Sequence, residues 1–204
     1  PLENKKAEEK MKIETILKMT RDELLAVPFY EIRHRLTASE TVYLIKMLGA
    51  FWSYDYTAAD KGRAGMHAEL KSGRHSDGFF ESRNLLKLPN IRHIIVLQMK
   101  MCLKAAHIEC PYYVAGVPDG ATQIGLDIAK MFWSRPVALK KVDGKIALAS
   151  EVAARKSFLL VEDVCSRGTG FIEAVRVVKE RQPEANILPF NPVILNRGGL
   201  KEVT

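Results

Sequence analysis

The 204-residue sequence predicts an α/β fold with a central, mostly parallel sheet flanked by helices, and a helical N-terminal extension. A short apolar strand, a tight loop and a helix follow one another twice, within residues 112–132 and again within 158–181. That order is typical of parallel strands joined by crossover helices. The first 60 residues carry instead two helix-start signals and no comparable strand. We therefore expect the helical extension over residues 1–60 and the α/β domain over residues 61–204.

The N-terminal part contains the start signals of two helices. Thr20 and Glu23 have the spacing of a capping box, so a short helix should follow and end near Pro28. Thr37 or Ser39 could begin a second helix. One face of that helix would carry four apolar residues at helical spacing, namely Leu44, Leu48, Phe51 and Trp52.

The middle of the chain contains two segments with different residue patterns. Residues 67–80 combine a polar stretch rich in Ser, Gly, Arg and Lys with Phe79 and Phe80, which predicts a strand, a loop and a strand. Residues 90–106 have apolar side chains at helical spacing and predict a helix. The β-branched run at 94–96 leaves a strand possible there.

The α/β domain is then expected to follow the strand–loop–helix order. Residues 112–117 form a strand, 118–121 a turn and 122–132 a helix. Residues 158–161 form a second buried strand that ends at Glu162 and Asp163. A loop at 166–170 and a helix at 171–181 complete the second unit.

Two more strand regions complete the predicted sheet. Residues 137–142 and 146–149 predict a hairpin around an Asp-Gly turn. A last strand near residues 187–195 contains Pro189 and Pro192, which favours the edge of a sheet.

The composition is that of a globular protein and limits the expected partners. Hydrophobic residues make up 47% and charged residues 27%, which excludes a disordered or low-complexity chain. The net charge of +7 suits an anionic ligand, but many proteins with such a charge bind no nucleic acid, so we expect no nucleic-acid partner. The apolar runs are too short to cross a bilayer, and residues 3–12 are charged where a secretory signal is apolar. We therefore expect no membrane partner.

The cysteines and histidines form no metal-binding or disulfide pattern. The three cysteines include no CxxC pair, which favours small buried thiols and a reducing, cytoplasmic location; they are Cys102, Cys110 and Cys165. The histidines also lack the spacing of metal ligands; they are His34, His67, His75, His93 and His107.

The acids that end the second strand are the strongest candidate for a functional site. In an open α/β sheet, ligands bind beyond the carboxyl ends of the strands. Backbone N–H groups of the loop at 166–170 and the helix after it suit a phosphate. Glu162 and Asp163 would repel that phosphate unless vicinal hydroxyls, a magnesium ion or a developing cation lay between. A ribose 5-phosphate satisfies these conditions. The alternative is an ordinary strand–helix turn with two solvated acids.

Four segments resemble a known family. Residues 158–170, FLLVEDVCSRGTG, resemble the phosphoribosyl-pyrophosphate (PRPP) motif of type I phosphoribosyltransferases. The other three are similar to segments of one branch, the orotate phosphoribosyltransferases. They are 69–80 (ELKSGRHSDGFF), 114–121 (VAGVPDGA) and 193–199 (VILNRGG). The resemblance covers residues 67–204 and implies the type I phosphoribosyltransferase fold for that part.

The resemblance also implies a role for individual residues. It places PRPP against Lys71, Asp119, Gly120, Lys140, Lys141, Glu162, Asp163, Val164, Cys165, Ser166, Arg167, Gly168, Thr169 and Gly170. It places orotate against Phe79, Phe80, Ser166 and Arg197, with Arg197 pairing with the orotate carboxylate. The catalytic roles fall to Asp163, Glu162, Lys145 and Lys141. Mg²⁺ is the implied cofactor, held mainly by PRPP with Glu162 and Asp163 nearby.

The implied reaction joins PRPP and orotate to give orotidine 5′-monophosphate and pyrophosphate, and the implied assembly is a homodimer. Acids near the ribose would oppose positive charge on the sugar, and lysines would oppose negative charge on the leaving pyrophosphate. The chain departs from the family at Gly120, often a lysine, and at Asn196, usually an aspartate. Its basic loop is also shorter, and residues 108–204 contain no histidine. Two alternatives follow: transfer to another nucleobase, or a PRPP-binding regulator without catalysis.

Overall fold

The computed structural model describes residues 16–63, 65, 67–70, 73–108, 110–199 and 201–203. The chain forms two compact units, Pro1–Asn90 and Ile91–Thr204. The predicted boundary between residues 60 and 61 falls within the first unit, and the domain assignment stays a prediction. The charged run at residues 3–12 lies outside the described residues.

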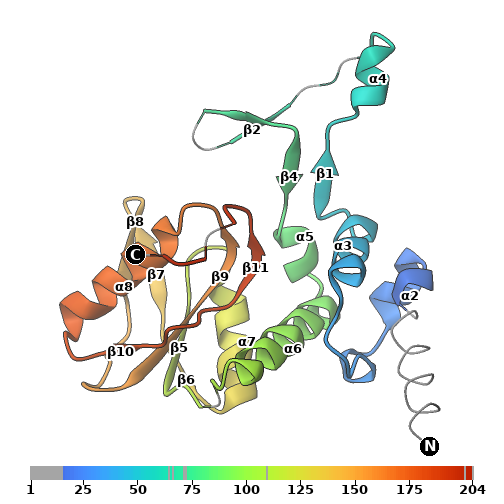
Figure 1. The fold of residues 1–204 in the computed structure, drawn as a ribbon. Coiled ribbons are helices and arrows are strands. Elements are labelled where there is room, and N and C mark those ends of the chain that lie inside the picture. The colour runs from blue at the N-terminus through green and yellow to red at the C-terminus, as the bar shows by residue number, and fades with distance from the viewer. Residues whose placement is uncertain are drawn as a thin grey trace, which may run out of the picture. The chain divides into compact units, whose positions relative to one another are not determined.

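The first unit contains short helices whose beginnings follow from the capping signals. The predicted capping box is confirmed, because Thr20 caps α2 with Glu23 at its third position. Of the two candidate caps for the second helix, Thr37 caps α3, and it does so in a second capping box with Glu40. Glu40 is fully buried and also lies 3.0 Å from His34. The helical elements of this unit (Figure 1) are η1 (Ile16–Lys18), α2 (Arg21–Ala26), η2 (Phe29–Glu31), α3 (Ala38–Met47), α4 (Tyr56–Asp60) and α5 (Arg83–Leu86).

The same unit contains two small antiparallel pairs of strands. β1 (Phe51–Ser53) pairs with β4 (Gly78–Phe80), and β2 (Ala68–Glu69) pairs with β3 (His75–Ser76). The prediction of strand, loop and strand is therefore confirmed. The prediction that Phe51 and Trp52 lie on a helix was wrong. The chain leaves α3 at Gly49, whose φ of 66° is left-handed, and both aromatic residues then pair with β4.

The second unit is built on a parallel sheet, as predicted. Neighbouring strands run in the order β10-β9-β5-β6, and β11 also pairs with β9; every one of these pairs is parallel. The strands are β5 (Tyr113–Gly116), β6 (Arg135–Pro136), β9 (Ser157–Cys165), β10 (Asn186–Ile187) and β11 (Val193–Asn196). The predicted hairpin is also present, as β7 (Leu139–Val142) and β8 (Lys145–Leu148).

Three helices accompany this sheet, and all three were predicted. They are α6 (Pro89–Ala105), α7 (Thr122–Phe132) and α8 (Thr169–Arg181). Arg92 of α6 and Asp127 of α7 form an ion pair at 2.6 Å that joins these two helices. Each described helix is too short or too polar to cross a membrane.

Two boundaries differ from the prediction. β9 continues through Glu162 and Asp163 to Cys165, because β11 provides a partner over that stretch, pairing Val193 with Glu162. The predicted single last strand is split into β10 and β11, and the two prolines lie in the break between them. The acids therefore belong to an extended, hydrogen-bonded strand and are held more rigidly than loop residues.

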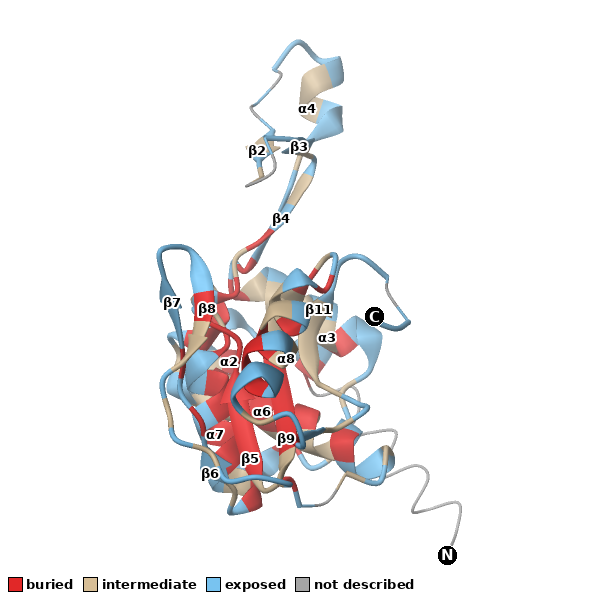
Figure 2. Ribbon diagram, turned by 90° about the vertical axis from the view of Figure 1, so that its left-hand side faces the viewer, coloured by how far each residue is buried: buried red, intermediate tan, exposed pale blue. Residues whose placement is uncertain are grey.

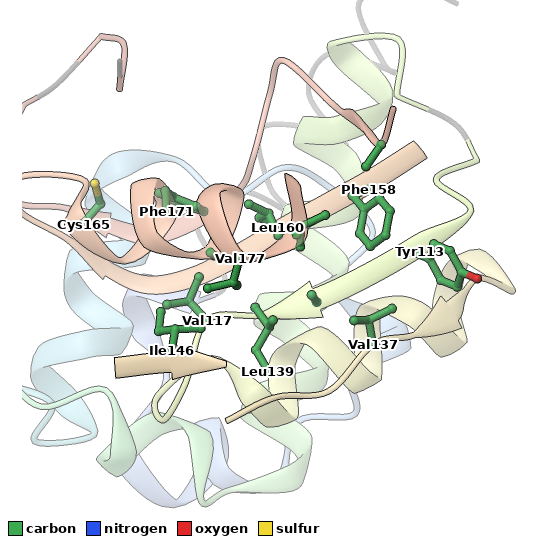
Figure 3. Packing of buried hydrophobic residues seen from close by; sticks show 14 residues of the cluster. Tyr113, Val117, Val137, Leu139, Ile146, Phe158, Leu160, Cys165, Phe171 and Val177 are labelled. Carbon is green, nitrogen blue, oxygen red and sulfur yellow. The ribbon is translucent and has the colours of Figure 1, made fainter. Parts of the chain in front are cut away.

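The core of the second unit lies on both faces of the sheet. β5 and β9 are buried along most of their length (Figure 2). On one face, Phe158 and Leu160 pack in a cluster with Phe171 and Val177 of α8, and Leu139 and Ile146 of the hairpin belong to the same cluster (Figure 3). On the other face α7 lies so close to β5 that a side chain at Gly125 would meet the backbone of Gly116.

Candidate active site

Two loops meet at the carboxyl ends of the adjacent strands β5 and β9. The first contains Asp119 and Gly120, and the second follows Glu162 and Asp163. Gly120 lies against the Asp163 carboxylate, and any side chain at position 120 would overlap it. A larger residue at position 120, such as the lysine that the family often has, would require the Asp163 carboxylate to move.

The Glu162 carboxylate is partly withdrawn from water. Its Oε2 atom is buried and has no hydrogen-bond partner among the described residues, and its Oε1 atom lies beside the Cα of Gly170. Burial, and then the charge of Asp163, raise the pKa of Glu162 to about 7, while the charge of Lys141 opposes the rise. A buried acceptor without a donor is costly, so this carboxylate is suited to a ligand that brings hydroxyl donors.

The segment Ser166–Gly170 leads from β9 into α8 and fits an anionic group. Gly168 is the N-cap of α8 and has a left-handed φ of 73°. The first N–H groups of this 13-residue helix and the positive end of its dipole face the loop. The first turn contains no acidic residue that would repel an anion there. Cys165, just before the loop, is buried as predicted, whereas the prediction of a buried thiol was wrong for Cys102 and Cys110, which are exposed. Burial and then the charge of Glu162 raise the pKa of the Cys165 thiol, while the Gly168 N–H opposes this rise.

Arg197 lies next to the same loop, at the end of β11. Its backbone N–H donates to the carbonyl oxygen of Cys165 at 2.8 Å, and the N–H of Gly198 donates to the same oxygen at 3.2 Å. The sequence prediction that residues 193–199 contribute to the site is consistent with this position, although the role of Arg197 stays a prediction.

The hairpin β7–β8 brings one lysine to the acids. Lys141 Nζ lies 3.5 Å from Asp119 Oδ2, and its charge acts on Glu162 as well. Lys140, its neighbour in the strand, is exposed and points to the opposite face, and Lys145 is exposed at the start of β8. Of the three hairpin lysines predicted for the site, the structure thus brings Lys141 to Asp119.

The hairpin is fixed to the rest of the second unit. Leu139 and Ile146 are buried in the core, and the Ile146 N–H donates to Glu173 Oε1 of α8 at 2.7 Å. Its turn consists of Asp143 and Gly144, both with left-handed φ, which is the geometry of a tight two-residue turn.

The predicted orotate contacts outside the second unit stay predictions. Phe79 and Phe80 lie on β4 in the first unit, with Phe80 buried, and Lys71 lies outside the described residues. Sequence reasoning did not include Val203, whose side chain lies against Gly168 and fills the space that a side chain there would need. No sequence pattern signals that contact, because it depends on the path of the chain after β11.

The donors at this site suit Mg²⁺ as part of a complex with phosphates. Glu162, Asp163 and Asp119 offer carboxylate oxygens, the hard ligands that Mg²⁺ prefers. Among the described residues, no group of three or more potential ligands is arranged to hold a metal ion. That Mg²⁺ is held mainly by the phosphates of PRPP, near Glu162 and Asp163, stays a prediction.

Comparisons with known proteins find relatives that carry one name. The sequence matches no family model. It is 29% identical over 136 residues to an orotate phosphoribosyltransferase of Helicobacter pylori, covering 65% of this chain and 65% of that protein. It is 27% identical over 120 residues to an orotate phosphoribosyltransferase of Caldicellulosiruptor bescii, covering 58% of this chain and 62% of that protein. The chain thus spans slightly less than two thirds of the length of these relatives.

Solved structures give the same fold. Orotate phosphoribosyltransferase from Aeropyrum pernix superimposes with a TM-score of 0.54 at 15% identity, covering 72% of this chain and 76% of that chain. Leishmania donovani UMP synthase gives a TM-score of 0.60 at 14% identity, covering 81% of this chain and 38% of that chain. Adenine phosphoribosyltransferase from Saccharomyces cerevisiae gives 0.53 at 17% identity, covering 69% and 89%. Identities this low establish the fold alone.

The chain thus has the type I phosphoribosyltransferase fold, as predicted. Within that class, its sequence similarity is to the orotate phosphoribosyltransferases.

Proposed function

We propose that the chain binds PRPP beyond the ends of β5 and β9 and transfers its ribose 5-phosphate to orotate. The products would be orotidine 5′-monophosphate and pyrophosphate. The observation that carries this proposal is the Glu162 carboxylate, buried without a partner, directly before a phosphate-suited loop and the first turn of α8. Similarity to orotate phosphoribosyltransferases supports the choice of reaction.

The geometry supports separate contacts for the phosphate and for the ribose hydroxyls. The 5′-phosphate would accept hydrogen bonds from N–H groups of Ser166–Gly170, while the two ribose hydroxyls donate to Glu162 and Asp163. The nitrogen of orotate attacks C1 as the bond from C1 to the pyrophosphate oxygen breaks. Positive charge then grows on the ribose, where the two carboxylates stabilise it.

Negative charge grows at the same time on the leaving pyrophosphate. Lys141 stands beside Asp119 at this end of the site and would neutralise part of that charge. Mg²⁺, when bound with PRPP, would supply further charge stabilisation at the phosphates. Because Lys141 is paired with Asp119, pyrophosphate must compete with the Asp119 carboxylate for this cation.

The base would be recognised by Arg197, with Ser166, Phe79, Phe80 and Lys71 as the further contacts implied by the resemblance. A guanidinium can bind a carboxylate through two parallel hydrogen bonds, which distinguishes orotate from bases without a carboxylate. We also propose that the protein is a homodimer and acts in the cytoplasm, as the resemblance and the cysteine pattern imply.

The test is a panel of nucleobases assayed with PRPP and Mg²⁺, with orotate consumption followed by absorbance. We expect turnover with orotate and much less with uracil, adenine or hypoxanthine. Arg197→Ala should lower kcat/KM for orotate about ten- to a hundredfold, the range of a lost charge-assisted hydrogen bond. Normal turnover of orotate by this variant would exclude the assigned base contact.

A second candidate function is PRPP binding without catalysis. The anchored hairpin favours this function, because a catalytic loop must close over its substrate. Lys141 and Lys145 lie on the strands beside a short turn, and the hairpin is tied to α8 through the hydrogen bond of Ile146 with Glu173. Such a protein would bind PRPP and consume no base in the panel. Consumption of orotate would exclude it.

A further inference from the structure

The indole of Trp133 is almost fully exposed, and no element of the described fold uses it. Its exposed fraction is 96%, the highest among the large apolar residues described. Trp133 ends α7 with a left-handed φ of 57°, a position that glycine occupies at lower cost. A tryptophan here therefore exposes apolar surface and strains the backbone, and neither effect benefits folding. We take this as a sign that the indole serves a partner.

The chain on either side of this indole is tied to Tyr112, whose ring carries two cations. The Ser134 hydroxyl donates to the carbonyl of Pro111, and the Arg135 N–H donates to the carbonyl of Tyr112 at 2.9 Å, so Trp133 is held beside the start of β5. The guanidinium of Arg135 and the ammonium of Lys156 lie 5.5 Å and 4.6 Å from the centre of the Tyr112 ring.

Lys130, one turn before Trp133 in α7, adds a third cation, and its carbonyl accepts the Trp133 N–H at 3.2 Å. We call these residues the Trp133 surface: Tyr112, Lys130, Trp133, Arg135 and Lys156. The ion pairs among the described residues include none of its three cations.

The Trp133 surface lies away from the candidate active site. Tyr112, Arg135 and Lys156 precede or begin strands β5, β6 and β9, whereas the active-site loops follow the other ends of β5 and β9. Because these strands are parallel, the Trp133 surface lies at their amino ends and the active-site loops lie at their carboxyl ends. Next to the Trp133 surface, at Pro111, is a hollow of about 510 Å³ lined by His107, Ile108, Cys110, Pro111 and Leu188.

We propose that the Trp133 surface binds single-stranded nucleic acid. An exposed aromatic ring beside several cations matches a strand that offers flat bases and phosphates together. A duplex fits less well, because its bases are already stacked and unavailable to the indole. A second copy of this chain also fits less well, since a two-fold contact would bring the same cations face to face. Net charge alone did not predict this partner; the placement of Trp133 among the cations does.

The proposal predicts that stability and binding respond in opposite directions at one residue. Trp133→Gly relieves the left-handed strain, so the melting temperature should stay the same or rise. Affinity for a fluorescein-labelled 12-nucleotide oligouridine RNA, measured by anisotropy, should fall about 5- to 100-fold through loss of base stacking. Trp133→Asn, which tolerates the same φ, gives a second variant with the same expectation.

Matched variants separate this surface from the rest of the protein. Phe190→Ala removes another exposed aromatic residue, 58% exposed, and should leave RNA affinity unchanged. Arg135→Ala and Lys156→Ala should each lower the slope of log affinity against log salt by about one. Glu162→Gln should leave RNA affinity unchanged, so the result does not depend on the proposed transferase reaction.

Three results would overturn the proposal. The first is no salt-sensitive binding of the RNA by the wild-type protein. The second is equal RNA affinity of the wild-type, Trp133→Gly and Trp133→Asn proteins. The third is a change in oligomeric state with Trp133→Gly, seen by sedimentation, without any change in RNA affinity; it would assign the surface to a second copy of the chain.

Discussion

Replacing Glu162 with Gln tests the proposed ribose contact, because it removes the charge and keeps the size of the side chain. Burial raises the pKa of Glu162 to about 7, so the carboxyl group changes its charge near neutral pH. The ionised carboxylate is the stronger acceptor for a ribose hydroxyl, because a charge-assisted hydrogen bond is stronger than a neutral one. PRPP affinity of the wild-type protein should therefore increase as pH rises through 7.

The magnitude follows from that pKa. Between pH 6 and pH 8 the ionised fraction of a group with a pKa of about 7 rises from about one tenth to about nine tenths. The apparent Kd is the intrinsic Kd divided by the competent fraction, so it should fall about tenfold over this range. Isothermal titration of PRPP with Mg²⁺ at a series of pH values measures the change.

Comparison with the Gln variant separates the ionisation of Glu162 from the ionisation of PRPP itself. The phosphates of PRPP also change charge in this pH range, but they do so equally for both proteins. The ratio of the two Kd values should therefore vary about tenfold between pH 6 and pH 8, with weaker binding to the variant at high pH. Identical pH profiles for the two proteins would refute the ribose contact.

Glu162→Gln should also change the pH dependence of the protein's stability. The folded pKa of Glu162 is raised above its ordinary value of 4.5, so the unfolded chain releases this proton first as pH rises. Ionisation of Glu162 therefore costs folded-state stability between about pH 4.5 and pH 7. Glu162→Gln should be more thermostable than wild type at pH 8 and lose that advantage near pH 4.5.

Three further predictions concern other parts of the chain. Gly120→Ala should weaken PRPP binding by at least about tenfold, because its Cβ would displace the Asp163 carboxylate, whereas Gly65→Ala, which has open space, should not; calorimetry compares them. Lys141→Ala should raise the inhibition constant of pyrophosphate about two- to fivefold in a competition assay, the range for one exposed charge contact. Thr37→Ala removes a helix cap and should lower the free energy of unfolding by about 1 kcal/mol in urea denaturation, while unchanged stability would contradict the capping assignment.

Much of the fold follows from local sequence signals. The capping box at Thr20 predicted the start of α2, Thr37 was one of two candidate caps for α3, and the Asp-Gly turn at residues 143–144 predicted the hairpin. Both strand–loop–helix units were predicted because their strands are short apolar runs bounded by turn residues. These signals act within a few residues and need no knowledge of the tertiary structure.

The errors arose where distant segments meet. β9 extends to Cys165 because β11 pairs with it, about 30 residues later in the chain, and no local pattern around Glu162 predicts that. Phe51 and Trp52 were assigned to a helix by their spacing, but the partner strand β4 determines their conformation. In both cases a strand distant in the sequence determines the local structure.

The candidate site was predictable in its residue types and not in its contacts. The acids and the glycine-rich loop are adjacent in sequence, so the anion site could be proposed from residues 162–170 alone. The pairing of Lys141 with Asp119 and the contact of Gly120 with Asp163 join separate loops. Only the parallel pairing of β5 with β9 brings those loops together.

The most direct measurement is a crystal structure of the protein with PRPP and Mg²⁺. Our account requires the 5′-phosphate to accept hydrogen bonds from backbone N–H groups between Ser166 and Gly170, and the ribose hydroxyls to lie within hydrogen-bond distance of Glu162 and Asp163. Density for the sugar phosphate at any other place, or hydroxyls directed away from both carboxylates, would contradict it.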